Sequence, residues 1–170
     1  GHHVQATLLD QALVKGRGWF ECSMLPLYGA HTILAEGGAN YAVNLSFNAA
    51  ERLDYDRNVV LPLVGLEALD SQLEMFHQFV PLVEQLNYAR NVAARKYLYS
   101  GESREQVIKW LMEFGLETRA MAEQRMIFID SLRSYVVTYN YGLDWITDQI
   151  ERGENTPRLT KWRRLRDLMP

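Results

Sequence analysis

The sequence has few residues that crosslink a chain or interrupt helices. A single cysteine, Cys22, excludes an internal disulfide framework. Five prolines and eleven glycines in 170 residues leave room for long helices. The longest apolar run, residues 59–66, is far below the roughly 20 residues that cross a bilayer, so no membrane span is expected. The chain has no surplus of basic residues, and its net charge of -3 argues against a general nucleic-acid binder.

Apolar residues are plentiful and recur at helical spacing. They make up 48% of the chain, and no stretch alternates in the manner of a half-buried strand. A chain of this length fits one domain with a sizeable core. We therefore predict an all-α, single-domain bundle over residues 1–170, with about six to eight helices, two of them long.

The starts of several helices are marked by capping residues. Asn48 with Glu51, and Ser103 with Gln106, match the capping box, in which each side chain accepts from the other's backbone N–H. Residues 156–157 (Thr-Pro) suit the N-cap and first position of a last helix.

Two longer periodic stretches predict the long helices. In the first, the predicted buried positions are Leu66, Leu69, Leu73, Phe76, Val80, Val83, Leu86, Ala93 and Tyr97. Pro81 is expected to kink this helix without ending it, because the pattern resumes beyond it. The second long helix is predicted from about Glu117 to Ile150.

Two short segments carry residue types that bind metals. Residues 1–5 read Gly-His-His-Val-Gln, and residues 36–41 read Glu-Gly-Gly-Ala-Asn-Tyr. Imidazole nitrogen and carboxylate oxygen are typical ligands of a catalytic zinc, which keeps three protein ligands and one open position. The residues alone also allow a simpler interpretation, in which the histidines are a cloning remnant and the glycines serve a tight contact between helices.

The two segments resemble motifs of a large bacterial family of zincin-like proteins, presumed to be metallopeptidases. Residues 1–5 are similar to the end of the family's H-E-x-x-P-G-H-H-x-Q motif, and residues 36–42 to its E-G-W-A-x-Y-A segment, with Gly38 in place of Trp. The resemblance implies zinc-dependent hydrolysis of a peptide or amide bond. It makes His2 and Glu36 metal ligands, and His3 a residue that stabilises a substrate or an oxyanion.

The same resemblance places the remaining parts of the site outside this chain. The first histidine of the family motif and the neighbouring glutamate, the general base, would lie just upstream of Gly1. The chain is therefore expected to be the C-terminal portion of a longer metallohydrolase-like protein and to be inactive alone. Zinc is expected for the complete protein, although imidazole and carboxylate ligands also suit manganese, iron or nickel.

A polar and aromatic patch interrupts the second long apolar stretch. Its members include Arg133, Tyr135, Tyr139 and Tyr141. Such groups are costly in a core unless they find partners or line a cavity. The resemblance implies a wall of the site opposite the metal. Tyr139 or Tyr141 would then donate to an oxyanion, while Arg133, with Tyr135 beside it, would bind a substrate carboxylate. The alternative is that the tyrosines are ordinary packed residues.

Other classes of function remain open at the level of sequence. The main alternative is a non-enzymatic helical binding or oligomerisation module, and a third is a relative that has lost its metal and kept the cavity. As an enzyme the protein would take a small peptide-like substrate. Assembly into a homo-oligomer is left open.

Overall fold

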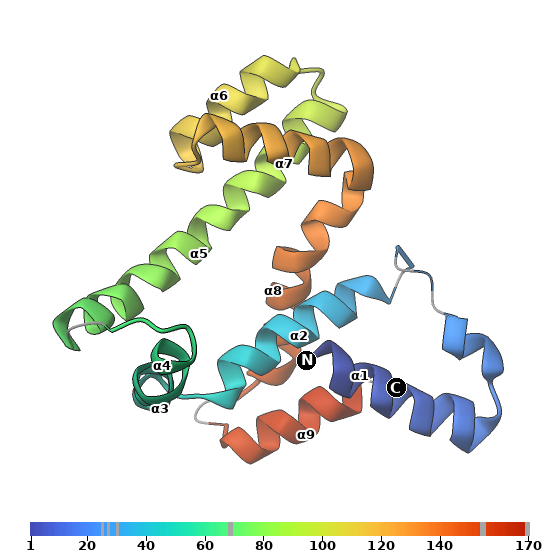
Figure 1. The fold of residues 1–170 in the computed structure, drawn as a ribbon. Coiled ribbons are helices and arrows are strands. Elements are labelled where there is room, and N and C mark those ends of the chain that lie inside the picture. Colours follow the sequence, from blue (N-terminus) through green and yellow to red (C-terminus); the bar gives the residue numbers. More distant parts are fainter. Residues whose placement is uncertain (25, 27, 30, 68–69, 154–155, 169–170) are drawn as a thin grey trace. The chain divides into compact units, whose positions relative to one another are not determined.

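In a computed structural model, residues 1–24, 26, 28–29, 31–67, 70–153 and 156–168 are described (Figure 1). Every regular element within these residues is helical, which confirms the predicted all-α class. No described helix is both long and apolar enough to cross a membrane. The chain forms two compact units, Gly1–Ser46 with Val137–Pro170 and Phe47–Val136.

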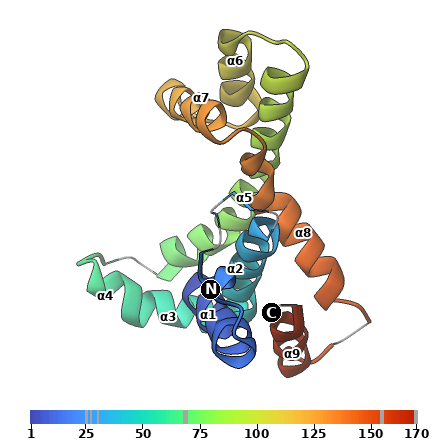
Figure 2. The same cartoon turned by 90° about the vertical axis from the view of Figure 1, so that its right-hand side faces the viewer.

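The first unit is built around two crossing helices, α2 and α8. Its elements are α1 (His2–Leu9), the π-helix η1 (Asp10–Lys15), the 3-10 helix η2 (Phe20–Met24), α2 (Thr32–Ser46), α8 (Thr138–Ile150) and α9 (Arg158–Leu168). Helices α1 and α9 lie beside α2, and α9 also contacts α8 (Figures 1 and 2). Tyr41 and Leu45 of α2, Ile146 and Ile150 of α8, and Leu165 of α9 form its core.

The last helix begins one residue later than the sequence predicts. Its first residue is Arg158, and Pro157 precedes it. The Thr156 hydroxyl, predicted to cap the helix, instead donates to the carbonyls of Arg152 and Gly153 at 3.3 and 3.1 Å. The Thr156 side chain therefore contacts the chain just after α8.

A polar network fastens α9 to α2 and α8. The Tyr41 hydroxyl donates to Glu151 Oε1 at 2.6 Å, and Lys161 of α9 pairs with the other oxygen of that carboxylate. Arg164 of α9 donates to the carbonyl of Ile150 at 2.6 Å, where a helix end lacks intrahelical partners. Burial and then the Glu151 carboxylate raise the pKa of Tyr41 well above its ordinary value.

This network predicts a pH dependence of stability. Lys161 and then Tyr41 hold the pKa of Glu151 below its ordinary value of 4.5. Because folding lowers this pKa, the carboxylate stabilises the fold above about pH 4.5, and the contribution is lost as the pH falls through the folded pKa. We expect a contribution of about 1 kcal/mol, since the carboxylate is partly exposed.

Urea unfolding at about pH 7 and pH 3.5 measures this contribution. Wild type should lose more stability between the two pH values than Glu151→Gln loses. Glu113→Gln, which removes an exposed carboxylate of the other unit, should keep the wild-type dependence. Equal pH dependence in wild type and Glu151→Gln would exclude this role of the network.

The second unit carries the longest helix. Its elements are α3 (Ala49–Tyr55), the π-helix η3 (Asp56–Val60), α4 (Leu61–Leu63), α5 (Asp70–Tyr99), α6 (Arg104–Phe114), α7 (Arg119–Leu132) and the 3-10 helix η4 (Arg133–Val137). Both predicted capping boxes are confirmed, at Asn48 with Glu51 and at Ser103 with Gln106. The core joins the C-terminal part of α5 to α6 and α7, through Ala93, Ala94, Val107, Ile108, Leu111, Ala122, Met126 and Ile129.

The first long stretch forms one helix through Pro81, but its predicted apolar face is only partly buried. The helix begins at Asp70, and Leu66, predicted to be buried in it, precedes it and is exposed. Leu73 and Ala93 are buried, whereas Phe76 and Val83 are 56% and 41% exposed. Leu69 lies outside the described residues. The N-terminal half of α5 thus exposes apolar side chains that the periodicity alone assigns to a core.

The second long stretch is helical from Arg119 and is broken near its middle. Helix α7 ends at Leu132, and Arg133 takes a positive φ of 47°. The chain continues through η4, where Tyr135 and Val136 are buried, before α8 begins. The break coincides with the boundary between the two compact units.

Candidate metal centre

The structure brings together the two residues expected to bind metal. His2 lies in the first turn of α1, and Glu36 lies in the second turn of α2, 34 positions along the chain. His2 Nε2 is 3.4 Å from Glu36 Oε2. The His2 side chain is 59% exposed and that of Glu36 is 14% exposed. The pair is therefore open to solvent on the histidine side and held by the protein on the carboxylate side.

Gln5 orients the imidazole of His2. The Gln5 amide nitrogen donates to the carbonyl of Ala35 at 3.0 Å, so its oxygen must face the other way. That oxygen is 3.1 Å from His2 Nδ1 and accepts its proton. This contact places a proton on Nδ1, whether or not Nε2 also carries one, and directs Nε2 towards Glu36. Histidine ligands of metals commonly donate their other ring N–H to an oxygen in this way.

Nε2 of His2 thus faces a carboxylate. A carboxylate oxygen is an acceptor, so at 3.4 Å the contact is favourable only if Nε2 carries a proton or a cation lies between the two atoms. With a proton, His2 and Glu36 form an ordinary ion pair. With a metal ion, they form two sides of a coordination site.

The distance between the two atoms suits zinc. Two ligands bonded to a tetrahedral zinc at about 2.1 Å stand roughly 3.4 Å apart, because the angle between the bonds is about 109°. The donor set thus fits two positions of a zinc site. Among the residues that the structure describes, no group of three or more His, Cys, Asp or Glu side chains is placed to hold a metal ion.

Glycines allow the backbones around this pair to approach closely. A Cβ added at Gly1 would lie 2.6 Å from Ala39 Cα, so α1 begins directly against α2. A Cβ at Gly37, next to Glu36, would overlap the carbonyl of Gly142 and lie 2.7 Å from its Cα. Glu36 is therefore carried by a helix crossing that glycine alone permits.

The two candidate tyrosines lie on α8, beside Gly142. At 100° per residue, Tyr139 lies about 60° from Gly142 around the helix axis and Tyr141 about 100° in the other direction. Gly142 faces α2, so Tyr139 is turned more towards α2 than Tyr141. In agreement, Tyr139 is half-buried and Tyr141 is 57% exposed. Tyr139 is the better candidate for a donor near Glu36.

The remaining candidates are placed elsewhere. His3 is exposed, and its carbonyl accepts from the Thr7 hydroxyl at 2.9 Å. Arg133 and Tyr135, the predicted substrate-binding residues, belong to the second compact unit, whereas His2 and Glu36 belong to the first. Arg133 is exposed and Tyr135 is buried, and their roles in binding a substrate stay predictions.

The contact of Gln5 with the His2 ring is not among the features predicted from the sequence. The signal was present, because Gln5 follows His2 by three residues and side chains at that spacing meet on a helix. Its second contact, with the carbonyl of Ala35, depends on the packing of α1 against α2.

No protein-family model matches the chain, and neither the curated proteins nor the solved structures contain a match.

Proposed function

We propose that His2 and Glu36 are two of the three protein ligands of a zinc ion in a hydrolase that cleaves a peptide or amide bond. The observation that carries this proposal is the 3.4 Å separation of His2 Nε2 and Glu36 Oε2, with Gln5 beside Nδ1 so that Nε2 faces the carboxylate. The resemblance of residues 1–5 and 36–42 to the zincin-like motifs supports it and supplies the type of metal and reaction.

Each residue has a distinct task under this proposal. His2 binds the metal through Nε2, Gln5 fixes the ring, and Glu36 contributes negative charge from a rigid helix crossing. When bound, zinc supplies a Lewis acid that polarises a substrate carbonyl and activates water. The Tyr139 hydroxyl would donate to the carbonyl oxygen as its negative charge develops. The resemblance implies a further histidine as the third ligand and a further glutamate as the general base.

Zinc binding tests the proposal in two proteins, this chain and one extended upstream by a His-Glu-x-x-Pro segment. The extended protein should hold about one zinc after dialysis, and Glu36→Gln should weaken zinc affinity at least about tenfold, since a ligand is lost. His3→Ala and Glu113→Gln should keep the metal. In this chain alone, zinc should bind weakly and shift the NMR signals of the His2 ring before those of His3.

Two results would refute the metal site. The first is an extended protein without zinc, and the second is a Glu36→Gln variant that binds zinc as tightly as wild type. This chain alone should show no peptide hydrolysis, and zinc-dependent turnover by it would contradict the expected place of the general base.

The alternative function is a non-enzymatic helical module in which His2 and Glu36 form an ion pair. The exposed position of His2 favours it, because an imidazolium at the surface needs no further ligand. In that case zinc would leave the His2 ring signals unchanged.

A further inference from the structure

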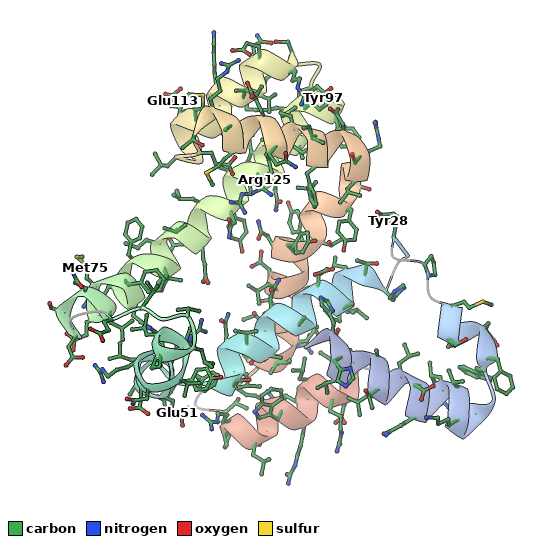
Figure 3. All side chains as sticks on the ribbon, viewed as in Figure 1. Tyr28, Glu51, Met75, Tyr97, Glu113 and Arg125 are labelled. Carbon is green, nitrogen blue, oxygen red and sulfur yellow. The ribbon has the colours of Figure 1, made fainter. Side chains whose placement is uncertain are left out.

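The N-terminal half of α5 exposes a stripe of large apolar side chains. We call Met75, Phe76, Phe79, Leu82 and Val83 the α5 stripe; they are 41% to 65% exposed. Met75 projects from this part of the helix in Figure 3. Contiguous apolar patches of this kind mark interaction sites on proteins.

The stripe continues the face that the same helix buries further on. Met75, Phe76 and Phe79 precede Ala93, Ala94 and Tyr97 by eighteen residues, which is about five turns of an α-helix, so the two sets share one face. Ala93 and Ala94 are buried in the core with α6 and α7. The same face is thus covered in its C-terminal half, where Arg90 pairs with Glu117, and exposed in its apolar N-terminal half.

The N-terminal half of α5 contacts the preceding helices through another face. Leu73 is buried, and His77 Nε2 lies 3.0 Å from Asp56 Oδ2 of η3. Around the helix axis, Leu73 and His77 lie about 120° and 160° from the centre of the α5 stripe, which is near Phe79. Packing against the preceding helices therefore leaves the stripe uncovered.

We propose that the α5 stripe is the contact surface of a homodimer, in which α5 of one copy packs against α5 of a second copy. The spacing Met75, Phe79, Leu82, Leu86 alternates four and three residues, as in the seams of paired helices. This spacing serves a self-complementary contact about a two-fold axis near Phe79.

The size and the charge of the α5 stripe fit a second copy of the chain as its partner. Five side chains that each expose on the order of 100 Å² give a buried area on the order of 1,000 Å² over two copies, which is the lower limit of specific interfaces. The residues flanking the stripe on its exposed side are neutral, Gln78 and Gln85, while Glu74 and Glu84 point away from it. Two copies can therefore meet without like-charge repulsion. A partner that is recognised through its charge would find no opposite charge among these flanking residues.

Sedimentation equilibrium of the whole chain at about 1–100 µM tests the proposal. Wild type should reach twice 19.7 kDa, and salt of about 0.5 M should leave the association unchanged, because apolar contacts are not screened. Phe79→Arg should raise the dissociation constant at least about tenfold. Tyr99→Arg is the matched control: Tyr99 is 74% exposed on the same helix, about 200° from Phe79, and should leave the dimer intact.

Crosslinking of cysteine variants gives a second measurement, which does not depend on whether the arginine variant folds. In a Cys22→Ser background, Phe79→Cys should form a disulfide-linked dimer on mild oxidation, and Tyr99→Cys should not. A wild-type protein that is monomeric at every concentration would overturn the proposal, and so would equal effects of Phe79→Arg and Tyr99→Arg. A dimer that dissociates in salt would overturn it as well, since its contact would then be ionic. None of these results depends on zinc.

Discussion

Gly37→Ala is expected to destabilise the first unit by about 3 kcal/mol, at the upper end of the cost of overpacking. The added Cβ would overlap the carbonyl of Gly142 and lie 2.7 Å from its Cα. These are backbone atoms of α8, which cannot rotate away as a side chain can. Helices α2 and α8 would have to separate, and the packing of Tyr41 against Ile146 would loosen with them. Chemical unfolding, followed by the signals of the first unit, measures the loss.

Asn40→Ala provides the matched control for Gly37→Ala. Asn40 is exposed on the same helix, and alanine there should leave stability unchanged or raise it slightly. Gly142→Ala should act like Gly37→Ala, because a Cβ at Gly142 would lie 3.0 Å from Gly37 N. The double variant should cost less than the sum of the two, since either substitution opens the same crossing. A loss below about 0.5 kcal/mol in Gly37→Ala would show that the crossing is not tight.

Features that depend on neighbouring residues could be predicted from the sequence. The capping boxes at Asn48 and Ser103 are found as expected, because both partners of each box lie within four residues. The continuity of α5 through Pro81 also follows from local pattern. The apolar periodicity located the helices for the same reason, but it could not tell a face buried in a core from one left exposed, such as that of Phe79.

The break at Arg133 could not be predicted from the local sequence. Neither Gly nor Pro stands between Leu132 and Val137 to signal it, and the positive φ falls on an arginine. The burial of Tyr135 and Val136 accompanies the change of direction, so tertiary packing overrides a pattern that favours a continuous helix.

The candidate site was predicted by resemblance and not by local physics. Nothing in the spacing of His2 and Glu36 along the chain requires them to meet, since the packing of α1 on α2 decides it. Gly37 was assigned a close backbone approach from its size, but its partner, Gly142, is more than one hundred residues away. The identity of the metal and the roles of the tyrosines stay predictions.

The burial of the Glu117 carboxylate could not be predicted from the sequence either, where the pattern places Glu117 at the start of a helix. It precedes the N-cap Thr118, and its side chain is 3% exposed. Its Oε1 lies 3.0 Å from Arg90 Nε of α5 and 3.6 Å from Arg125 Nε of α7. This carboxylate therefore joins α5 and α7 at the α6–α7 connection, where Leu116 takes a positive φ of 51°.

Glu117→Gln is expected to destabilise the second unit by about 3 kcal/mol, because removing one partner of a buried pair leaves an uncompensated charge. Here two guanidinium groups, those of Arg90 and Arg125, would lose their shared anion. Unfolding of the variant beside Glu113→Gln measures the effect. Glu113 is exposed on α6, and its loss should change stability by less than about 0.5 kcal/mol.

A double variant separates the charge effect from a packing effect. If the cost arises from unpaired guanidinium, Arg90→Met should recover part of the stability lost in Glu117→Gln, since the methionine keeps most of the apolar stem without the charge. If the cost arises from shape alone, the two losses should add. An additive result, or a Glu117→Gln variant as stable as wild type, would show that the carboxylate is not what holds α5 to α7.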